Sequence, residues 1–292
     1  MTLHWQPADL AMTTDSFDAA ARVGRFHLAF NRHGDITRIG EQFVSYPFHF
    51  TRPFRLDSDI PELLTAYQQS SSGGLYRDDR LDNRLVVTAG AAAHVTTQAA
   101  SVVHACHGMP ARQTTRIEVE ADGYLAYTPD PAILFPGAAL DARIELRLDP
   151  DAVVLLHDAF AWHDPAAANG AFDRLCNDVT VYDRNGRLRL RDRFVVTGAQ
   201  LGATFGTGRD WRVVSTSLLL GPAARLPSRD VLRDALALHD ILVGISALPN
   251  DAGWCVRGIA TSAVASRRAA NAAFVASVQA AFDGRTPAPR RK

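Results

Sequence analysis

Alternation of apolar and charged residues with a period of two is the feature that most restricts how this chain can fold. Phe26, Leu28 and Phe30 are separated by single basic or small residues. Residues 143–149 repeat the pattern, with aliphatic side chains set between arginines and acidic residues. Because successive side chains of a β-strand point to opposite faces, these segments predict strands with one buried and one solvated face.

The clearest connection between two such strands lies within residues 179–196. Asn185-Gly186 separates two alternating segments there, and Asn-Gly tolerates positive φ at both central positions of a tight turn. The segment is therefore predicted to form a β-hairpin. The same criteria predict further strands at residues 85–88, 94–98, 115–119, 153–157, 241–248 and 254–260.

Helical periodicity is confined mainly to the last quarter of the chain. Ser228 can cap a short helix over 229–239, and Ser262 or Ser266 can begin a final helix that runs to about Phe282. No Pro/Ser-rich linker and no fixed-period repeat divides the 292 residues. The sequence thus predicts a single, mainly β domain of many short strands in stacked sheets, with two α-helices in the C-terminal quarter. Residues 1–20 and 285–292 are expected to be loose ends.

Composition restricts the partners and the compartment. The formal net charge is zero, so no overall field attracts nucleic acid or an anionic membrane. No segment reaches the roughly 18 unbroken apolar residues of a membrane span, and no signal peptide is evident. Cys106, Cys176 and Cys255 are odd in number and widely spaced, which argues against a disulfide framework. A reducing cytoplasm is the expected location.

One short cluster could contact a metal ion. His104, Cys106 and His107 are soft ligands of the kind that nickel, zinc or copper prefers. On a strand, His104 and Cys106 would share a face and His107 would point away. A closed structural site normally needs four ligands and no second cluster completes this one, so the alternatives are a transient metal contact or an ordinary strand end. Asp78 and Asp79 lie in a dense charged run and could hold a divalent cation or line a polar passage; a solvated, mutually paired loop is the other interpretation.

Catalytic motifs are missing from the sequence. Ser72-Gly73-Gly74 lacks the ending of a phosphate-binding P-loop, and a tight turn between strands explains its glycines more simply. Neither a Gly-x-Ser-x-Gly elbow nor an HExxH motif is present, so no catalytic residue is assigned. Arg187, Arg189 and Arg191 alternate with leucines rather than aromatics, which favours a solvated strand face, or an arginine-lined partner surface, over a nucleic-acid strip.

A proline-rich segment is the oddest local feature. Pro129, Pro131 and Pro136 surround Ile133 and Phe135. Each proline removes a backbone donor, so the segment is predicted to be an edge strand bounded by turns and covered by the protein itself or by a partner.

Three motifs in order resemble the signature of one family, the urease accessory proteins called D in most bacteria and H in some. The first is Ser-Gly-Gly-Leu followed by Asp-Arg-Leu, the second a Val-Thr-Thr-Gln-Ala strand, and the third a Tyr-x-Pro-x-Pro-x-Ile-Leu-Phe-x-Gly-Ala segment. Weaker similarity continues through Asp158 and Asp192-Arg193. The signature or partner-binding positions are Ser72, Gly73, Gly74, Asp79, Arg80, Thr96, Thr97, Gln98, Pro129, Pro131, Phe135 and Gly137.

The resemblance implies a non-catalytic cytoplasmic scaffold in the maturation of urease, a nickel enzyme of nitrogen metabolism. Such a chaperone of metallocentre assembly binds urease apoprotein and accessory protein F, which recruits the GTPase accessory protein G, and a dimer can form through that complex. Nickel would be in transit, through a water-filled passage in the scaffold, with no tightly bound cofactor. The residue types themselves, rather than the resemblance, make Asp78, Asp79, His104, Cys106 and His107 the candidates for transient contacts with the metal.

The sequence departs from the family pattern in two places. Tyr76-Arg77-Asp78 stands where the family often has small residues, and Gly170-Ala171 stands where it commonly has Gly-Glu. These departures leave open a paralogous β-rich interaction module with another partner. A separate alternative is a small metal-dependent hydrolase on a β scaffold, which would use His104, Cys106, His107 and nearby carboxylates.

Overall fold

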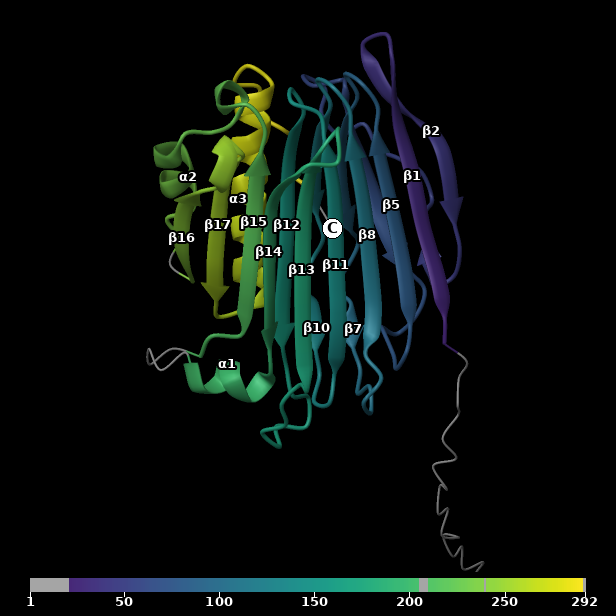
Figure 1. Ribbon diagram of the computed structural model, residues 1–292, viewed down its shortest axis with the longest axis vertical. Coiled ribbons are helices and arrows are strands. Elements are labelled where there is room, and N and C mark those ends of the chain that lie inside the picture. Colours follow the sequence, from purple (N-terminus) through teal and green to yellow (C-terminus); the bar gives the residue numbers. More distant parts are fainter. Residues whose placement is uncertain (1–20, 205–209, 239, 291–292) are drawn as a thin grey trace, which may run out of the picture.

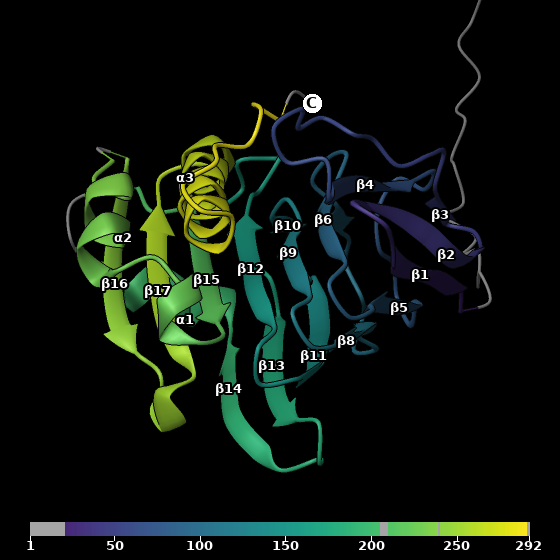
Figure 2. The same ribbon diagram turned by 90° about the horizontal axis from the view of Figure 1, so that it is seen from above.

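Two β-sheets packed face to face form the body of the protein, and helices cover the outer side of one of them (Figures 1 and 2). This computed structural model describes residues 21–204, 210–238 and 240–290. The expectations for residues 1–20, His239 and residues 291–292 lie outside that part of the chain. The mainly β fold predicted from the sequence is confirmed.

The first sheet has seven strands in the order β14-β13-β11-β8-β5-β1-β2. The second has ten, of which eight follow the order β16-β17-β15-β12-β9-β6-β4-β3, while β10 pairs with both β12 and β7. The bounds in the first sheet are β1 (Val23–His33), β2 (Ile36–Val44), β5 (Arg80–Val87), β8 (Ala111–Val119), β11 (Ala139–Leu148), β13 (Arg174–Asp183) and β14 (Leu188–Val196). In the second they are β3 (Phe48–His49), β4 (Leu63–Ser70), β6 (Ala92–Thr97), β7 (Val102–Val103), β9 (Tyr124–Thr128), β10 (Ala132–Leu134), β12 (Val153–Trp162), β15 (Val213–Leu220), β16 (Ile241–Ala247) and β17 (Gly253–Ala260).

Between β4 and β13 the chain winds from one sheet to the other and back. Apart from the short β7 and β10, each strand in this region is followed by one in the opposite sheet, so neighbours within a sheet run parallel. The first-sheet strands of this winding begin at residues 80, 111, 139 and 174. Their unequal spacing explains why no fixed-period repeat is visible in the sequence.

The hairpin and both C-terminal helices are confirmed. β13 and β14 pair antiparallel around the turn at Asn185-Gly186, although only Gly186 has a positive φ there, of 78°. Ser228 accepts a hydrogen bond at the start of α2 (Arg229–Ala235), which is shorter than expected. Ser262, not Ser266, caps α3 (Ala263–Ala281). A third helix, α1 (Gly198–Thr204), was not predicted, and two 3₁₀ turns lie at Ala223–Arg225 and Pro249–Asp251.

Two predictions are corrected by the structure. The segment around Ile133 is not a sheet edge, because β10 lies between β12 and β7 and pairs with both in parallel. The end of the chain up to residue 290 is not loose. Arg285 donates to Glu62 at 2.7 Å, and Arg290 makes two hydrogen bonds to Asp57, at 2.9 and 2.8 Å. Arg290 and Asp57 are both buried, so this ion pair holds residue 290 against the start of the second sheet.

Three apolar clusters make up the core. One packs between α2, α3 and the outer side of the second sheet and includes Tyr124 and Phe274. The other two lie between the sheets. The first includes Phe26 and Leu125, and the second includes Leu140. Complete burial of a side chain such as Phe26 stabilises the fold by roughly 1.5–3 kcal/mol. The space between the sheets therefore holds two separate apolar clusters rather than one continuous core.

Candidate functional site

A layer of polar side chains separates the two apolar clusters between the sheets. Gln68 on β4 donates through Nε2 to Oδ1 of Asn83 on β5 at 3.1 Å, and Asn83 donates through Nδ2 to Oγ1 of Thr115 on β8 at 3.1 Å. All three residues are buried. Strand alternation places them among leucines and phenylalanines that point the same way. Buried polar groups cost free energy unless they are paired, so this hydrogen-bonded row is a specific feature of the fold.

The layer continues across the second sheet through Tyr127 and Asp158. Tyr127 on β9 hydrogen-bonds with Thr115 and Asn83, and burial raises the pKa of its hydroxyl to about 12. Asp158 on β12 accepts a hydrogen bond from Nδ2 of Asn177 at 2.7 Å. Burial raises the pKa of the Asp158 carboxyl to about 6, although the bond from Asn177 acts against this shift. A nearly neutral carboxyl therefore stands in the layer at mildly acidic pH.

The far end of the layer holds an ion pair and two unused acceptor atoms. Arg257 on β17 donates to Oδ1 of Asp192 at 2.5 Å and to Oγ1 of Thr216 at 3.1 Å. Oδ2 of Asp192 and Oδ1 of Asn177 are buried and have no hydrogen-bond partner among the described residues. Oxygen acceptors in this state can be satisfied by water or by a cation, for which carboxylate and amide oxygens are suitable ligands.

Cavities open at both ends of the layer. One, of about 220 Å³, is lined by Gln68, Gln98, Gln113 and the loop residues Ser72–Gly74. The other, of about 610 Å³, is lined by Asp158, Asp192, Thr216 and Arg257, together with apolar residues of β14, β16 and β17. Gln68 belongs to the first cavity and Asp158 to the second. The polar layer thus connects two hollows through the interior of the sandwich.

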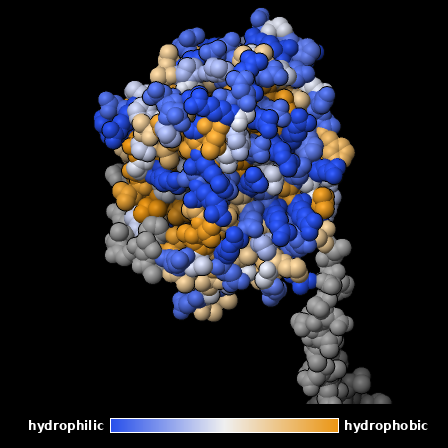
Figure 3. Space-filling view, in the orientation of Figure 1, coloured by the Kyte–Doolittle hydropathy of each residue, from blue (hydrophilic) through white to orange (hydrophobic). Residues whose placement is uncertain are grey.

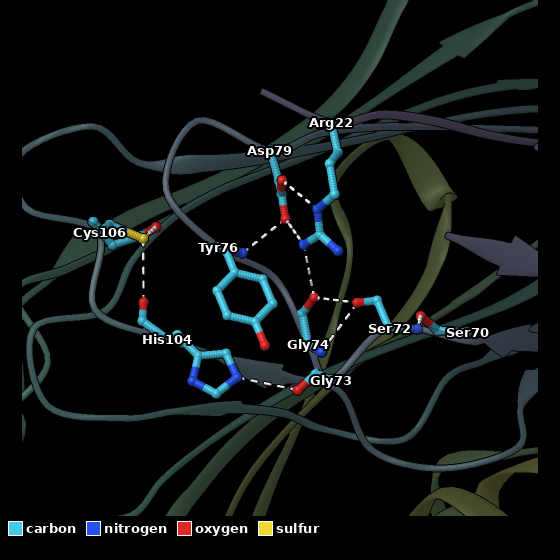
Figure 4. A network of polar contacts seen from close by, with 10 residues as sticks. Arg22, Ser70, Ser72, Gly73, Gly74, Tyr76, Asp79, His104 and Cys106 are labelled. Atoms are coloured by element: carbon cyan, nitrogen blue, oxygen red, sulfur yellow. Dashed lines mark hydrogen bonds and ion pairs between the residues drawn. The ribbon is translucent and has the colours of Figure 1, made fainter. Parts of the chain in front are cut away.

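The Ser-Gly-Gly loop beside the smaller cavity is held by a buried ion pair (Figure 4). Arg22 donates through Nε to Oδ1 of Asp79 at 2.9 Å, and its Nη2 contacts the other carboxylate oxygen. The same carboxylate accepts from the backbone N–H of Tyr76 at 2.7 Å. Arg22 also donates to the carbonyl of Gly74 at 3.1 Å. Asp79 is buried and both of its carboxylate oxygens accept hydrogen bonds, so this side chain anchors the loop.

The other candidate metal ligands do not converge. The imidazole of His104 stacks on Tyr76, with ring centroids 4.4 Å apart, and its Nε2 lies 3.0 Å from the carbonyl of Gly73. The thiol of Cys106 is buried and donates to the carbonyls of His104 and Ala139. Asp78 accepts from Arg112 at 2.8 Å. Within the described residues, no group of three or more His, Cys, Asp or Glu side chains is placed to hold a metal ion, and His107 is not drawn into one.

Comparison with known proteins is decisive about the family. Residues 22–292 match the UreD urease accessory protein family. The chain belongs to the UreD family. It is 42% identical over 235 residues to urease accessory protein UreD 1 of Methylorubrum extorquens (strain PA1), covering 80% of each chain. It is 39% identical over 265 residues to UreD 3 of Bradyrhizobium sp. (strain ORS 278), covering 91% of this chain and 93% of the relative. UreD 1 of Pseudomonas syringae pv. syringae (strain B728a) is 38% identical over 272 residues, with coverage of 91% and 94%.

These UreD relatives are named as accessory proteins, which is consistent with a non-catalytic role. The match begins at Arg22, the partner of Asp79. Sequence reasoning missed Arg22 because 57 residues separate the two side chains. No described helix is long and apolar enough to cross a membrane.

The UreD signature residues mostly shape loops in this structure. Thr97 accepts from the backbone N–H of Asp130 at 2.8 Å and thereby fixes the segment from Pro129 to Pro131. Thr96 donates to the carbonyl of Thr128 at 2.6 Å. Gly74 has a φ of 139°, and a Cβ there would clash with the carbonyl of Val102, so glycine is required.

Three further signature positions lie around the same loops. Gln98 accepts from Gln69 at 2.6 Å at the rim of the smaller cavity. Phe135 contacts His104 edge to face, with ring centroids 5.7 Å apart. Gly137 has a φ of 74° and lies against Ala105. Arg80, in contrast, is exposed and lies 3.4 Å from Asp78.

Sequence reasoning also missed most of the polar layer. Asn83, Thr115 and Asn177 belong to no motif considered above, because a buried polar residue within a strand looks like one more outward-facing position. The available signal was the weak family similarity at Asp158 and Asp192.

Proposed function

We propose that this chain is a non-catalytic scaffold for urease maturation. It binds urease apoprotein and accessory protein F, which recruits the GTPase accessory protein G, and it assists delivery of nickel to the urease active site. The observation that carries the proposal is the match to the UreD family over residues 22–292. The work of such a scaffold takes place in the cytoplasm, and any dimer forms through the accessory complex.

The polar layer supports a role in nickel transit. A hydrated divalent cation cannot cross an apolar sandwich, since stripping its water without replacement ligands is costly. The layer offers oxygen ligands that could replace this water one after another along the route. They are the amides of Gln68 and Asn83, then the hydroxyl of Tyr127, and then the carboxylates of Asp158 and Asp192. Two oxygens of the layer, on Asn177 and Asp192, have no hydrogen-bond partner in the part of the chain that the structure describes. The route from the smaller cavity to the larger one is the proposed passage.

The ligand types suit a cation that passes rather than stays. Transport requires binding that is favourable enough for entry and weak enough for exit. Nickel held firmly in proteins takes imidazole or thiolate ligands, whereas the layer supplies oxygens. Nickel is thus cargo, and no cofactor is bound tightly.

Urease activation in cells tests the main proposal. Urease subunits and the other accessory proteins are produced with and without this chain, and urease activity and nickel content per enzyme are measured. We expect both to collapse when the chain is omitted. Full activity on ordinary nickel without the chain would overturn the proposal.

A variant pair tests the passage. Asp158→Asn with Asp192→Asn should reduce nickel per urease at limiting nickel while leaving the complex with urease intact in pull-downs. Asp230→Asn is the control, because Asp230 is exposed in the first turn of α2 and does not belong to the polar layer. Equal nickel delivery by both would refute the passage. A stoichiometric, tightly bound metal in the purified chain would instead favour the metal-dependent hydrolase.

A further inference from the structure

The outer face of the seven-stranded sheet carries a concentrated positive charge. None of the described helices covers this face, which is turned toward the viewer in Figure 1, and hydrophilic residues dominate it in Figure 3. Five adjacent strands, β5, β8, β11, β13 and β14, define what is called here the basic face. Strand alternation turns nine arginines outward from them: Arg80, Arg84, Arg112, Arg116, Arg143, Arg147, Arg174, Arg191 and Arg193.

Only five acidic residues point outward from the same strands, namely Asp82, Glu118, Asp141, Glu145 and Asp178. A sixth carboxylate, Asp78 just before β5, pairs with Arg80 and Arg112. Nine arginines against six carboxylates leave an excess of three positive charges on one face of a chain whose net charge is zero. The excess is therefore a matter of placement, not of composition.

The arginines also stand above their acidic neighbours. Arg191 is 54% exposed, whereas Asp178, which accepts its hydrogen bonds at 2.9 and 2.6 Å, is 17% exposed. Arg116 is 53% exposed above Asp82 at 31%. An approaching surface thus meets guanidinium groups first.

The strand register places like charges side by side. Arg84 is directly opposite Arg116 on the neighbouring strand, and Arg80 is opposite Arg112, although Asp78 pairs with both members of the second pair. Such pairs are unfavourable in a sheet. A single carboxylate, Asp178, lies among Arg143, Arg191 and Arg193 and lacks the charge to neutralise them. The isolated chain thus carries a repulsion that an opposing negative surface would relieve.

We propose that the basic face is a docking surface for a flat, carboxylate-rich face of a protein partner. Guanidinium groups form paired, directional bonds with carboxylates and are enriched at protein interfaces. Nucleic acid is disfavoured, because Tyr182 is the only aromatic side chain directed outward on these strands and the interspersed carboxylates would repel phosphates. Taking urease apoprotein as the partner rests on the proposed function above.

Charge reversal tests the docking surface. Arg84→Glu with Arg116→Glu reverses two neighbouring charges on β5 and β8 of the basic face, and Arg233→Glu with Arg268→Glu makes the same charge change on the exposed surfaces of α2 and α3. Association with purified urease apoprotein is measured by biolayer interferometry at 50 and 300 mM NaCl. At low salt we expect association to slow at least tenfold for the basic-face variant and less than twofold for the control. The difference should shrink at high salt, because long-range steering is screened.

Each outcome decides the matter. If the wild-type chain binds urease and the basic-face variant binds equally well, or both variants lose binding equally, the docking surface is wrong and the proposed function stands. If the wild-type chain does not bind urease, both proposals fail. Salt-sensitive binding of a 30-base-pair DNA duplex that only the basic-face variant loses would assign the face to nucleic acid. Arg143→Gln with Arg147→Gln replaces the first variant if that one unfolds, with the same expected direction.

Discussion

Asp79 and Asp158 are both carboxylates in the interior of the sandwich, but their surroundings are opposite. Asp79 faces the cation of Arg22 and a backbone N–H, so its charge is compensated where it lies. Asp158 has the amide of Asn177 as its side-chain donor, and burial raises its pKa to about 6. The first site completes its own bonding, while the second is left with unsatisfied neighbours.

The two carboxylates thus separate a loop-building role from the proposed role in nickel transit. The most recognisable motif of the chain contains Asp79 and builds a loop, whereas the residues suited to handling a cation lie in strands that carry little signature. A motif can therefore identify a family while the working chemistry lies elsewhere in the fold. Four experiments test how far the two carboxylates differ.

Removing the charge of Asp79 should have the largest effect. Asp79→Asn leaves the partly buried guanidinium of Arg22 without its counter-charge, which we expect to lower the free energy of unfolding by about 3 kcal/mol. Urea denaturation measures this loss. Asp78→Asn is the control, since the ion pair of Asp78 with Arg112 is exposed to solvent and contributes at most about 1 kcal/mol. Small, equal losses in both would return Asp79 to the candidate metal ligands.

The same substitution at Asp158 should act in the opposite direction. Because the folded-state pKa of about 6 lies above the ordinary 3.8, the folded chain binds the proton more tightly, and stability falls as pH rises from about 4 to 6. Asp158→Asn removes that penalty, so at pH 8 we expect a gain of about 2 kcal/mol, somewhat below the full linkage value. Denaturation at pH 4.5 and 8 checks the sign. A loss at pH 8 would show that the charged form is stabilised in the fold.

Nickel delivery should depend on pH through the same group. Below about pH 6 Asp158 is protonated and loses its value as a cation ligand. We expect the rate of urease activation in a purified system to fall several-fold between pH 7.5 and 5.5. The Asp158→Asn variant should be slow throughout and lack this step. An identical pH profile in the variant would assign the step to another group.

Tyr76, the bulky departure near Asp79, should contribute least. Its ring stacks on His104 and lies under the guanidinium of Arg22, 4.8 Å from the ring centroid. Tyr76→Ala removes both contacts at a site that is 42% exposed, and we expect a loss of about 1 kcal/mol in thermal or urea unfolding. A loss as large as that of Asp79→Asn would make the aromatic stack, not the ion pair, the main support of the loop.

Alternation most clearly revealed the strands that have one solvated face, namely β1, β11 and the β13–β14 hairpin. Parts of β6 and β12 were also predicted, although both strands are covered on both sides. β4, β9 and β15 are likewise covered on both sides and were missed, because they lack a period of two. The short α1 has no apolar stripe to reveal it. The proline-rich segment was taken for an edge because its missing donors were visible, while its partners on β7 and β12 were not.

The candidate site was predictable only in part, for a reason of distance. His104, Cys106 and His107 are adjacent in sequence, yet stacking, carbonyl contacts and a loop direct them to separate surroundings. Asn83 and Thr115 are 32 residues apart and Asp158 and Asn177 are 19 apart, and only the winding brings each pair together. Contacts of this kind depend on topology, which local patterns do not encode.

The winding of the chain between the sheets also affects how the protein is made. β5 pairs with β8, β8 with β11, and β11 with β13, so each strand needs a partner that is synthesised later. The chain must therefore be synthesised as far as Asp183 before β5, β8 and β11 can be paired on both sides. Parallel pairing across such separations forms slowly. During that interval the unfinished sheets display open edges, which are prone to aggregate. A cell that makes this protein in excess should therefore accumulate it in inclusion bodies before it accumulates it in folded form.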